Sequence, residues 1–362
     1  MRRGSAKLSM SEVIGPAYQL TGKVLDDGWV IRARLEYDGT HTGGSYSVCY
    51  NVEKDGCQYF LKAFNLEAYV KGSGEPNERF AEMTRMVRQY EYEKSLSEFC
   101  KENGVSKVEC IIANGVTTID GDQTVIPYLI FERADGDVRK FISSLTTVNN
   151  AWRFKSLHDV AVGLDQLHRI GVYHQDVKPS NVLTYGEDSK LGDLGRAVRN
   201  LSDCPFLSER YWGDKTYMAP EVAYTSSIGK EERRMLLTDL YLLGSLITYY
   251  FVDVPFNGLL YQHINPERHF NNSSLTYNEV LEDLKEAYVR AIELIQASLT
   301  IDDDNVKTQL IGLIKGLCNP DIERRHHPSA GAEHIIGSKY GLERVISTLD
   351  FFHRKMKYKL RR

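Results

Sequence analysis

The chain has 362 residues, a charged fraction of 26% and a formal net charge of −4 at pH 7. This length is enough for two lobes with cores of their own, and the composition is ordinary for a folded globular protein. A weakly acidic balance gives no reason to expect nucleic acid or a membrane surface as the main partner.

The cysteines and apolar stretches indicate the compartment. Six cysteines are scattered without the spacing of metal sites or disulfide frameworks, which favours a reducing compartment, and we expect the cytoplasm. The two arginines near the start are not followed by an apolar run, so no secretory signal is expected. The most apolar stretch, 236–252, contains Asp239 and is short for a membrane span. We therefore expect a buried helix there and no transmembrane segment.

The first third of the chain has the pattern of a small sheet. Residues 1–17 are expected to be a flexible leader, and residues 18–133 a sheet-rich lobe. One helix is expected over 78–101. Lys54-Asp55-Gly56 predicts a hairpin turn between two strands. The strands are expected over 29–35, 45–52, 57–64, 108–113 and 124–131.

Residues 134–345 change to helical patterns. Apolar residues recur at spacings of three and four between Leu157 and His168, and 280–298 and 306–317 are amphipathic. Residues 346–362 carry a basic run that is expected to be a solvated, frayed tail. The fold class is therefore α+β, with a small antiparallel-sheet lobe containing one helix and a larger helical lobe. A cleft at the join would be a natural ligand site.

A set of polar residues with definite spacing lies near the midpoint. Asp176, Lys178 and Asn181 put a carboxylate, an ammonium and an amide at offsets 0, +2 and +5, and Asp193 follows. Transfer of a phosphoryl group to a hydroxyl requires such groups: a base for the hydroxyl, a cation for the phosphate, and oxygen ligands for Mg²⁺.

The motifs around these residues resemble those of a known family. Tyr173-His174-Gln175-Asp176-Val177-Lys178-Pro179-Ser180-Asn181 resembles the catalytic loop of eukaryotic-type protein kinases. Asp193-Leu194-Gly195 and Ala219-Pro220-Glu221 resemble the DFG and APE motifs, at the expected intervals. The resemblance runs from about residue 20 to about residue 335 and implies a two-lobed protein-kinase-like fold.

The resemblance also implies roles and cofactors. Asp176 would be the base, Lys178 would neutralise charge on the transferred phosphoryl group, and Asn181 and Asp193 would bind the metal. ATP and Mg²⁺ are the implied cofactors. The lysine two residues after Asp176 is similar to the Ser/Thr pattern, which implies a protein substrate with a Ser or Thr acceptor, and autophosphorylation.

Lys62 is the lysine within a strongly apolar strand, where an ammonium must meet an anion. By resemblance it reaches the nucleotide phosphates and pairs with a glutamate of the 78–101 helix. Glu93 and Glu91 are both candidates. We prefer Glu93, because it shares a helix face with Leu96 and Cys100.

The remaining nucleotide-binding residues follow from position alone. Gly43, Gly44 and Val48 stand where the family has its Gly-rich loop, although His41 and Tyr46 replace two of its glycines, so the motif is degenerate.

The resemblance implies an adenine pocket as well. Leu183 would form its floor, Phe131 would precede the hinge, and Glu132 and Ala134 would belong to the hinge. Phe60 stands where a small residue usually covers the adenine, so it is expected to narrow the pocket.

Three charged positions are expected to be structural. Asp239 would steady the backbone of the catalytic loop, and either Arg324 or Arg325 would pair with Glu221, since a buried carboxylate needs a partner.

Asp137 would bind the ribose or a basic substrate side chain, or would be a solvated loop residue.

Two departures affect the functional interpretation. Gln175 replaces the arginine that usually binds a phosphorylated activation loop, which predicts a non-RD kinase active without such phosphorylation. Asp214 stands where a threonine usually bridges the catalytic Asp and Lys, so either Thr216 substitutes or the bridge is absent.

The alternatives to an active Ser/Thr kinase are a kinase-like binding module with weak or no catalysis, and a small-molecule kinase.

Overall fold

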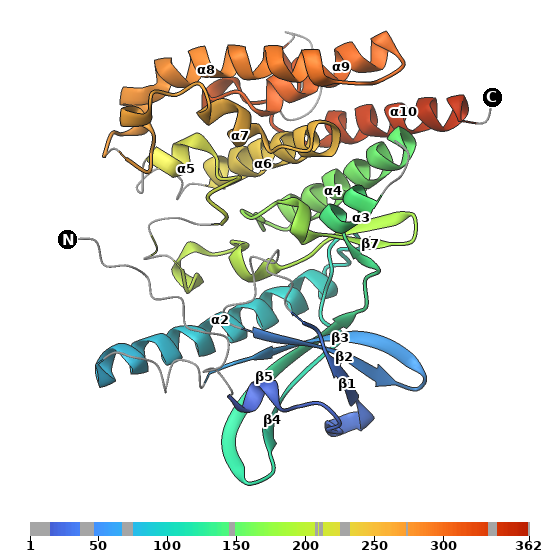
Figure 1. The fold of residues 1–362 in the computed structure, drawn as a ribbon, viewed down its shortest axis with the longest axis vertical. Helices are drawn as coiled ribbons and strands as arrows, with labels where there is room; N and C mark the ends of the chain where they lie inside the picture. The colour runs from blue at the N-terminus through green and yellow to red at the C-terminus, as the bar shows by residue number, and fades with distance from the viewer. Residues whose placement is uncertain are drawn as a thin grey trace. The chain divides into compact units, whose positions relative to one another are not determined.

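The computed structural model describes residues 15–36, 47–66, 75–144, 149–206, 209, 213–224, 232–272, 274–331 and 339–360. The chain divides into two compact units, which we call the sheet unit and the helical unit. The sheet unit comprises Met1–Glu98 and Cys110–Arg133, and the helical unit comprises Phe99–Glu109 and Ala134–Arg362. Figure 1 shows the elements of each. Phe99–Glu109, which the sequence assigned to the first lobe, groups with the helical unit.

The sheet unit is built on five antiparallel strands in the order β1-β2-β3-β5-β4. Their bounds are β1 (Val30–Arg34), β2 (Ser47–Lys54), β3 (Cys57–Phe64), β4 (Ala113–Ile119) and β5 (Asp122–Glu132). The predicted hairpin is confirmed. Asp55 and Gly56 have φ of 51° and 77° and form a two-residue turn, so Lys54 faces Cys57.

Alternation along the strands gives the sheet two apolar faces. One face is covered by the segment that begins at Ala17, with Trp29 and Ile31 packed on Leu61 and Ala63. The end of the expected leader is thus part of this core, and Ala17 O accepts a 2.6 Å hydrogen bond from the Tyr50 hydroxyl. Helix α2 (Pro76–Glu102) packs on the second face through its residues Met86 and Tyr90.

One strand lies later than the sequence predicted. The expected strand over 108–113 is wrong, because Val108 forms an isolated bridge with Leu191 of the helical unit's small sheet and pairing with β5 begins only at Ala113. The true strand β4 alternates between half-buried and exposed residues and contains Asn114 and Gly115, so its apolar signal is weak.

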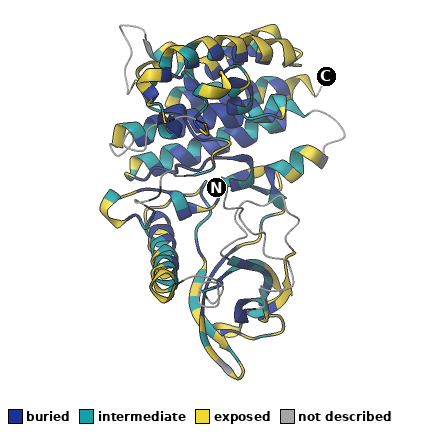
Figure 2. Ribbon diagram, turned by 60° about the vertical axis from the view of Figure 1, so that its left-hand side comes forward, coloured by how far each residue is buried: buried dark blue, intermediate teal, exposed yellow. Residues whose placement is uncertain are grey.

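The helical unit combines a small sheet with eight helices in its described part. The sheet has the order β6-β7-β8, from Gly136–Asp137, Val182–Tyr185 and Asp188–Leu191. Figure 2 shows that buried residues gather on the central helices of this unit and exposed residues on its outer ones. The helices are α3 (Val138–Ser144), α4 (Asn150–Arg169), α5 (Pro220–Tyr224), α6 (Glu232–Val252), α7 (Phe256–Tyr261), α8 (Tyr277–Ser298), α9 (Asp304–Leu317) and α10 (Glu343–Lys359).

Helix α6 is the core helix of this unit. Within the part of the chain that the structure describes, it is the one helix long and apolar enough to cross a membrane, but 78% of its most apolar stretch is buried in the protein. A mostly buried core helix passes the same composition test, and the position of Asp239 among its buried residues agrees with the predicted core helix.

The expected solvated tail is wrong for residues 346–359. They belong to α10, where Val345, Leu349, Phe352 and Met356 recur at helical spacing and are buried. Helix α10 lies along α4 (Figure 1), and His353 Nδ1 is 2.8 Å from Ala151 O. The basic residues therefore occupy the outer face of a packed amphipathic helix.

Candidate active site

Asp239 of α6 holds the catalytic loop in place. Its side chain is buried, its Oδ2 accepts a 2.8 Å hydrogen bond from His174 N–H, and its Oδ1 accepts one of 2.8 Å from Gln175 N–H. Two consecutive peptide groups immediately before Asp176 are therefore fixed by one carboxylate, as expected for Asp239.

Gln175 adds a second attachment at the same place. Its backbone adopts the left-handed region, with φ of 61°, which a non-glycine residue holds only when its surroundings enforce it. Its side-chain Nε2 donates to Met235 O at 2.8 Å and to Asp239 Oδ1 at 3.0 Å. The Gln175 side chain thus ties the loop to α6.

Asp176, Lys178 and Asn181 form one hydrogen-bonded array. Lys178 Nζ lies 2.9 Å from Asp176 Oδ2. Asn181 Nδ2 donates to Asp176 O at 2.9 Å and to Asp176 Oδ2 at 3.0 Å. All three side chains are nearly buried, with exposures of 6%, 8% and 6%. The spacing 0, +2, +5 therefore brings a carboxylate, an ammonium and an amide to a single point.

The surroundings shift the protonation equilibria of this array. Burial raises the pKa of the Asp176 carboxyl, and the charge of Lys178 opposes this rise. Burial disfavours the charged form of Lys178, but the carboxylates of Asp176, Asp214 and Asp193 outweigh it and raise the pKa of the ammonium. A carboxylate whose proton affinity is raised is a better proton acceptor than an exposed aspartate.

Asp214 completes the array in a way that the sequence did not predict. Its backbone N–H donates to Asp176 Oδ1 at 3.0 Å, and its Oδ2 lies 3.7 Å from Lys178 Nζ. Thr216 instead donates its own N–H to Asp214 Oδ1 at 2.8 Å. The expectation that Thr216 substitutes or that the bridge is absent is therefore wrong, because Asp214 makes the bridge itself.

Gly213 explains how Asp214 comes so close to the catalytic loop. A Cβ on Gly213 would lie 2.7 Å from Gln175 O and 3.2 Å from Asp176 Oδ1, and its φ is 79°. Only glycine tolerates both conditions.

Asp193 lies two residues after the end of β8, where it is exposed and forms the N-cap of the short 3-10 helix Leu194–Arg196. Its φ is 61°, and its Oδ1 accepts a 3.3 Å hydrogen bond from Gly195 N–H. The preceding Gly192 donates its N–H to Asn181 O at 2.8 Å, and its carbonyl oxygen lies 3.1 Å from His174 Nε2. The two expected metal ligands are thus joined by a backbone hydrogen bond one residue away from Asp193.

The donor chemistry of these two residues fits Mg²⁺. Magnesium prefers oxygen ligands and is usually bound by one or two carboxylates together with substrate phosphates. Both Asn181 Nδ2 hydrogen bonds go to Asp176, which fixes the orientation of the amide and of its Oδ1. Asp193 presents an exposed carboxylate.

In the sheet unit, Lys62 of β3 pairs with Glu93 of α2. Lys62 Nζ lies 2.8 Å from Glu93 Oε1 and 2.9 Å from Oε2, and the two side chains are 20% and 4% exposed. Glu91 pairs instead with Lys94, at 2.6 Å on the surface of α2. The preference for Glu93 is thus confirmed by the geometry.

The register of the hairpin changes one expected residue. Cys49 stands opposite Lys62 and shares its face, whereas Val48 stands opposite Ala63 and is packed in the core on the other face. Val48 is therefore not placed to line a nucleotide site with Lys62. Phe60 does share the face of Lys62, with its ring centroid 6.2 Å from that of Phe131.

The other expected nucleotide-binding residues lie in several places. Glu132 is exposed at the end of β5, and Ala134 is half-buried. Leu183 of β7 packs beside Gly192, since a Cβ there would lie 2.8 Å from Leu183 Cδ1. Gly43 and Gly44 lie outside the described residues.

Two further charged residues are structural. Arg325, not Arg324, pairs with Glu221, at 2.6 and 2.9 Å, and both side chains are fully buried. Asp137 accepts hydrogen bonds from Arg139 N–H and Lys140 N–H at the start of α3, and its carboxylate pairs with the Arg139 guanidinium. These contacts make it a structural residue of the helix start and not a solvated loop residue.

Comparison with known families identifies the architecture. The protein kinase domain family matches residues 43–340. The chain belongs to the protein kinase family. Its antiparallel-sheet unit with one helix and its helical unit are the two lobes of the kinase fold.

Individual relatives of this kinase match over shorter stretches. Mitogen-activated protein kinase 5 of Arabidopsis thaliana is 35% identical over 101 residues, 28% of this chain and 26% of that protein. Serine/threonine-protein kinase ppk18 of Schizosaccharomyces pombe is 39% identical over 77 residues, 21% of this chain and 6% of that protein. Probable serine/threonine-protein kinase PknB of Bifidobacterium longum is 26% identical over 163 residues, 41% of this chain and 22% of that protein. The matched stretches span less than a third of these relatives.

Two placements around the candidate site were not predicted from the sequence: Cys49 on the face of Lys62, and the contact of Asp214 N–H with Asp176. The position of Cys49 was detectable from the hairpin register. A two-residue turn at Asp55 and Gly56 pairs Lys54 with Cys57, and counting back along both strands places Cys49 opposite Lys62. The position of Asp214 was noted in the sequence, but its contact with Asp176 gave no such signal, since it depends on a close approach between Gly213 and a loop far away in the sequence.

Proposed function

We propose that this chain is an ATP- and Mg²⁺-dependent protein kinase that transfers the γ-phosphoryl group to Ser or Thr hydroxyls of protein substrates, including its own. The supporting observation is the array in which Lys178 Nζ, Asn181 Nδ2 and Asp214 N–H all contact the Asp176 carboxylate within 3.0 Å. An array held by that many donors is preorganised for a single geometry, which is what positioning catalysis requires.

Each side chain has one task in this proposal. Asp176 accepts or orients the proton of the acceptor hydroxyl, and Lys178 meets the charge of the moving phosphoryl group. Lys62, held by Glu93, binds the nucleotide phosphates. Asn181 and Asp193 would hold Mg²⁺, which supplies neutralisation of phosphate charge.

The acceptor class and the regulation follow from two residues. Lys178, two positions after Asp176, resembles the Ser/Thr pattern, and two of the relatives carry names of serine/threonine kinases. Gln175 uses its side-chain amide on Met235 and Asp239 and brings no cation to the activation segment. We therefore propose a non-RD enzyme that is active without phosphorylation of that segment.

The second candidate is a kinase-like binding module with weak or no catalysis. Two observations favour it. Phe60 lies on the face of Lys62 where the family has a small residue, and Asp214 adds a second carboxylate near Lys178. Both features would weaken nucleotide binding or phosphoryl transfer rather than the fold.

One experiment separates these functions. The full chain and its Asp176→Ala variant are incubated with γ-labelled ATP and Mg²⁺, alone and with a generic basic protein, and phosphosites are mapped by mass spectrometry. We expect phosphoserine and phosphothreonine with the wild type only. Labelling by Asp176→Ala would contradict the assignment of the base. A nucleotide-dependent thermal shift without transfer would favour the binding module, and transfer to small acceptors alone would favour a small-molecule kinase.

The cytoplasm is the compartment that we propose. Its support is that none of the six cysteines, all of which lie in the described part of the chain, forms a disulfide.

A further inference from the structure

Residues 107–109, at the end of the segment Phe99–Glu109, run beside the last residue of β8, which ends two residues before Asp193. Glu109 N–H donates to Leu191 O at 2.7 Å, and Leu191 N–H donates to Lys107 O at 2.9 Å. Val108 is thereby paired in parallel with Leu191, the last residue of β8. Because Asp193 follows two residues later, this short pairing adds support immediately before the expected metal ligand.

The same segment is attached to α4. Gln166 Oε1 accepts hydrogen bonds from Ser106 N–H at 3.0 Å and Lys107 N–H at 2.9 Å. A Cβ on Gly163 would lie 2.6 Å from Lys107 O, so glycine is required for this approach of helix and segment. The backbone around Lys107 is therefore held on two sides, by α4 and by β8.

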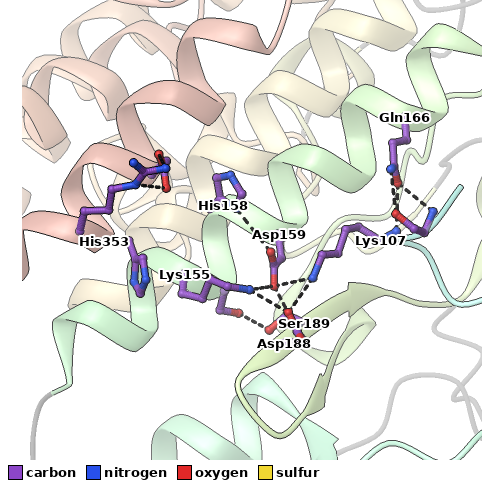
Figure 3. A network of polar contacts seen from close by, with 12 residues as sticks. Lys107, Lys155, His158, Asp159, Gln166, Asp188, Ser189 and His353 are labelled. Carbon is purple, nitrogen blue, oxygen red and sulfur yellow. Dashed lines mark hydrogen bonds and ion pairs between the residues drawn. The ribbon is translucent and has the colours of Figure 1, made fainter. Parts of the chain in front are cut away.

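Four charged side chains join the three elements, as Figure 3 shows. Lys107 and Lys155 reach from opposite sides toward Asp159 and Asp188. Lys107 Nζ lies 3.0 Å from Asp159 Oδ2 and 2.8 Å from Asp188 Oδ1. Lys155 Nζ lies 2.6 Å from Asp159 Oδ2 and 2.8 Å from Asp188 Oδ1. We call these four residues the charge cluster.

Asp159 is the buried centre of the charge cluster. Its side chain is 1% exposed, and its Oδ2 also accepts a 3.0 Å hydrogen bond from the N–H of Ser189 in β8. Burial alone would raise the pKa of the Asp159 carboxyl, but hydrogen bonds from His158, Lys155, Ser189 and Lys107 outweigh it and hold that pKa well below its ordinary range. At neutral pH Asp159 is therefore charged, and its carboxylate holds the first two residues of β8.

We propose that the charge cluster is a positioning device for Asp193, with Lys107 and Asp159 as positioning residues that fix β8 between α4 and the segment Phe99–Glu109. The inference rests on the proposed function only in giving Asp193 a metal to bind. Its structural part, the restraint of β8, is independent of that function.

The geometry of β8 explains why such a device would matter. The strand has four residues, Asp188–Leu191, and pairs with β7 on one side. The charge cluster holds its first two residues, and the pairing with Lys107 and Glu109 holds its last. A strand this short has few ladder hydrogen bonds of its own, so loss of the outer restraint would let its end and Asp193 move.

The test compares Lys107→Met with two other lysine variants of the full chain. Lys107→Arg keeps the charge. Lys355→Met is the matched control, because Lys355 forms a 2.9 Å ion pair with Asp303 at a similar exposure of 31% against 23% for Lys107, on α10. Amide hydrogen exchange of residues 188–195 without nucleotide or metal is measured first. We expect faster exchange in Lys107→Met alone.

The second measurement is the Mg²⁺ concentration at half-maximal binding of a fluorescent ATP analogue. We expect it to rise about three- to tenfold in Lys107→Met, the range of couplings carried through supporting residues, and to stay at the wild-type value in the other two variants. A purely stabilising role would lower the melting temperature without shifting this concentration.

The outcomes are distinguishable. Unchanged exchange in Lys107→Met would overturn the inference, whatever the chain catalyses. Faster exchange with an unchanged Mg²⁺ requirement would overturn the positioning of Asp193. If the wild type binds no nucleotide with Mg²⁺, the proposed function fails while the exchange result still tests the restraint of β8. If Lys107→Met does not fold, Gln166→Ala, which removes the hydrogen bonds to Ser106 and Lys107, must give the same two shifts.

Discussion

Two ion pairs of this kinase, one in each unit, show how similar chemistry is used in opposite ways. Arg325 and Glu221 are both 0% exposed, whereas Lys62 and Glu93 are 20% and 4% exposed. Arg325 also donates to Asn319 O and Leu237 O, and Glu221 accepts from the Thr238 hydroxyl. The Arg325–Glu221 pair is therefore closed to solvent, and both side chains have further hydrogen-bond partners inside the protein.

The second pair remains reachable from solvent on the side of the lysine. A sealed pair can only support the fold, because no ligand can approach it. A lysine that is held by one carboxylate and partly exposed can still meet a phosphate. Under the proposed function, residual exposure would separate a pair that serves stability from one that serves binding, and substitutions can test this.

The largest expected effect is on the sealed pair. Arg325→Met should lower the free energy of unfolding by about 3–5 kcal/mol, because Glu221 would remain as a buried charge that has lost its guanidinium partner. Denaturant unfolding measures it. Arg324→Met is the matched control, since Arg324 is 76% exposed and its ion pair with Asp321 is 3.5 Å long; we expect about 0–1 kcal/mol there. A similar loss in both variants would contradict the comparison.

The reachable pair should show the opposite profile. Lys62→Met should reduce kcat/KM for phosphoryl transfer by about 10²–10³-fold, the usual loss for an electrostatic contact to the reacting group. The loss of stability should be smaller than for Arg325→Met, because this pair is partly open to solvent on the side of the lysine. Steady-state kinetics and thermal unfolding measure the two quantities. Lys94→Met, which removes a surface pair with Glu91 on the same unit, should leave both unchanged. Loss of stability without loss of transfer would reverse the assignment.

Asp214 is an intermediate case, because its carboxylate is close to Lys178 but not required to hold Asp176. Asp214→Ala keeps the backbone N–H that donates to Asp176 Oδ1 and removes the carboxylate 3.7 Å from Lys178 Nζ. We expect kcat to fall about tenfold, as for the loss of one charge-assisted contact. Single-turnover transfer rates measure it, and a rate above that of the wild type would instead show that Asp214 restrains Lys178.

The smallest effect concerns pH. The folded-state pKa of Asp159 is lowered, so its ionised form adds stability above its unfolded pKa of about 3.9, and this is lost as the pH falls through the folded-state pKa. Asp159→Asn should therefore cost about 1–2 kcal/mol at pH 7, and the difference from the wild type should shrink in acid. Urea unfolding at several pH values measures it.

Asp165 on the same helix gives the control of opposite sign. Burial raises the pKa of the Asp165 carboxyl, so its ionised form does not favour folding at neutral pH. Asp165→Asn should leave the stability at pH 7 unchanged or higher. Equal losses in the two variants would contradict the different roles of these aspartates.

The sequence predicted those features whose signal is local. The turn at Asp55 and Gly56, the buried helix face that distinguishes Glu93 from Glu91, and the array of Asp176, Lys178 and Asn181 each depend on spacing along a single segment. Local periodicity and turn chemistry are sufficient for such features.

The features that were missed depend on contacts between distant segments. The strand expected at 108–113 was displaced because Val108 pairs with Leu191, and part of the expected tail is a helix that packs along α4, with Phe352 against Phe154 of α4. The bridge from Asp214 to Asp176 required a glycine at 213 to meet a loop 38 residues earlier in the chain. The pattern of residues within one segment does not predict such contacts between distant segments.

The attachment of Gln175 has a consequence for how this enzyme can evolve. Its amide fills two acceptor positions on α6 while its backbone is held at a φ of 61°. An arginine at this position would give up the amide contacts on α6 unless its guanidinium took the same two acceptors. Under the proposed regulation, a gain of phosphorylation control through residue 175 would therefore also alter how the loop is attached to α6.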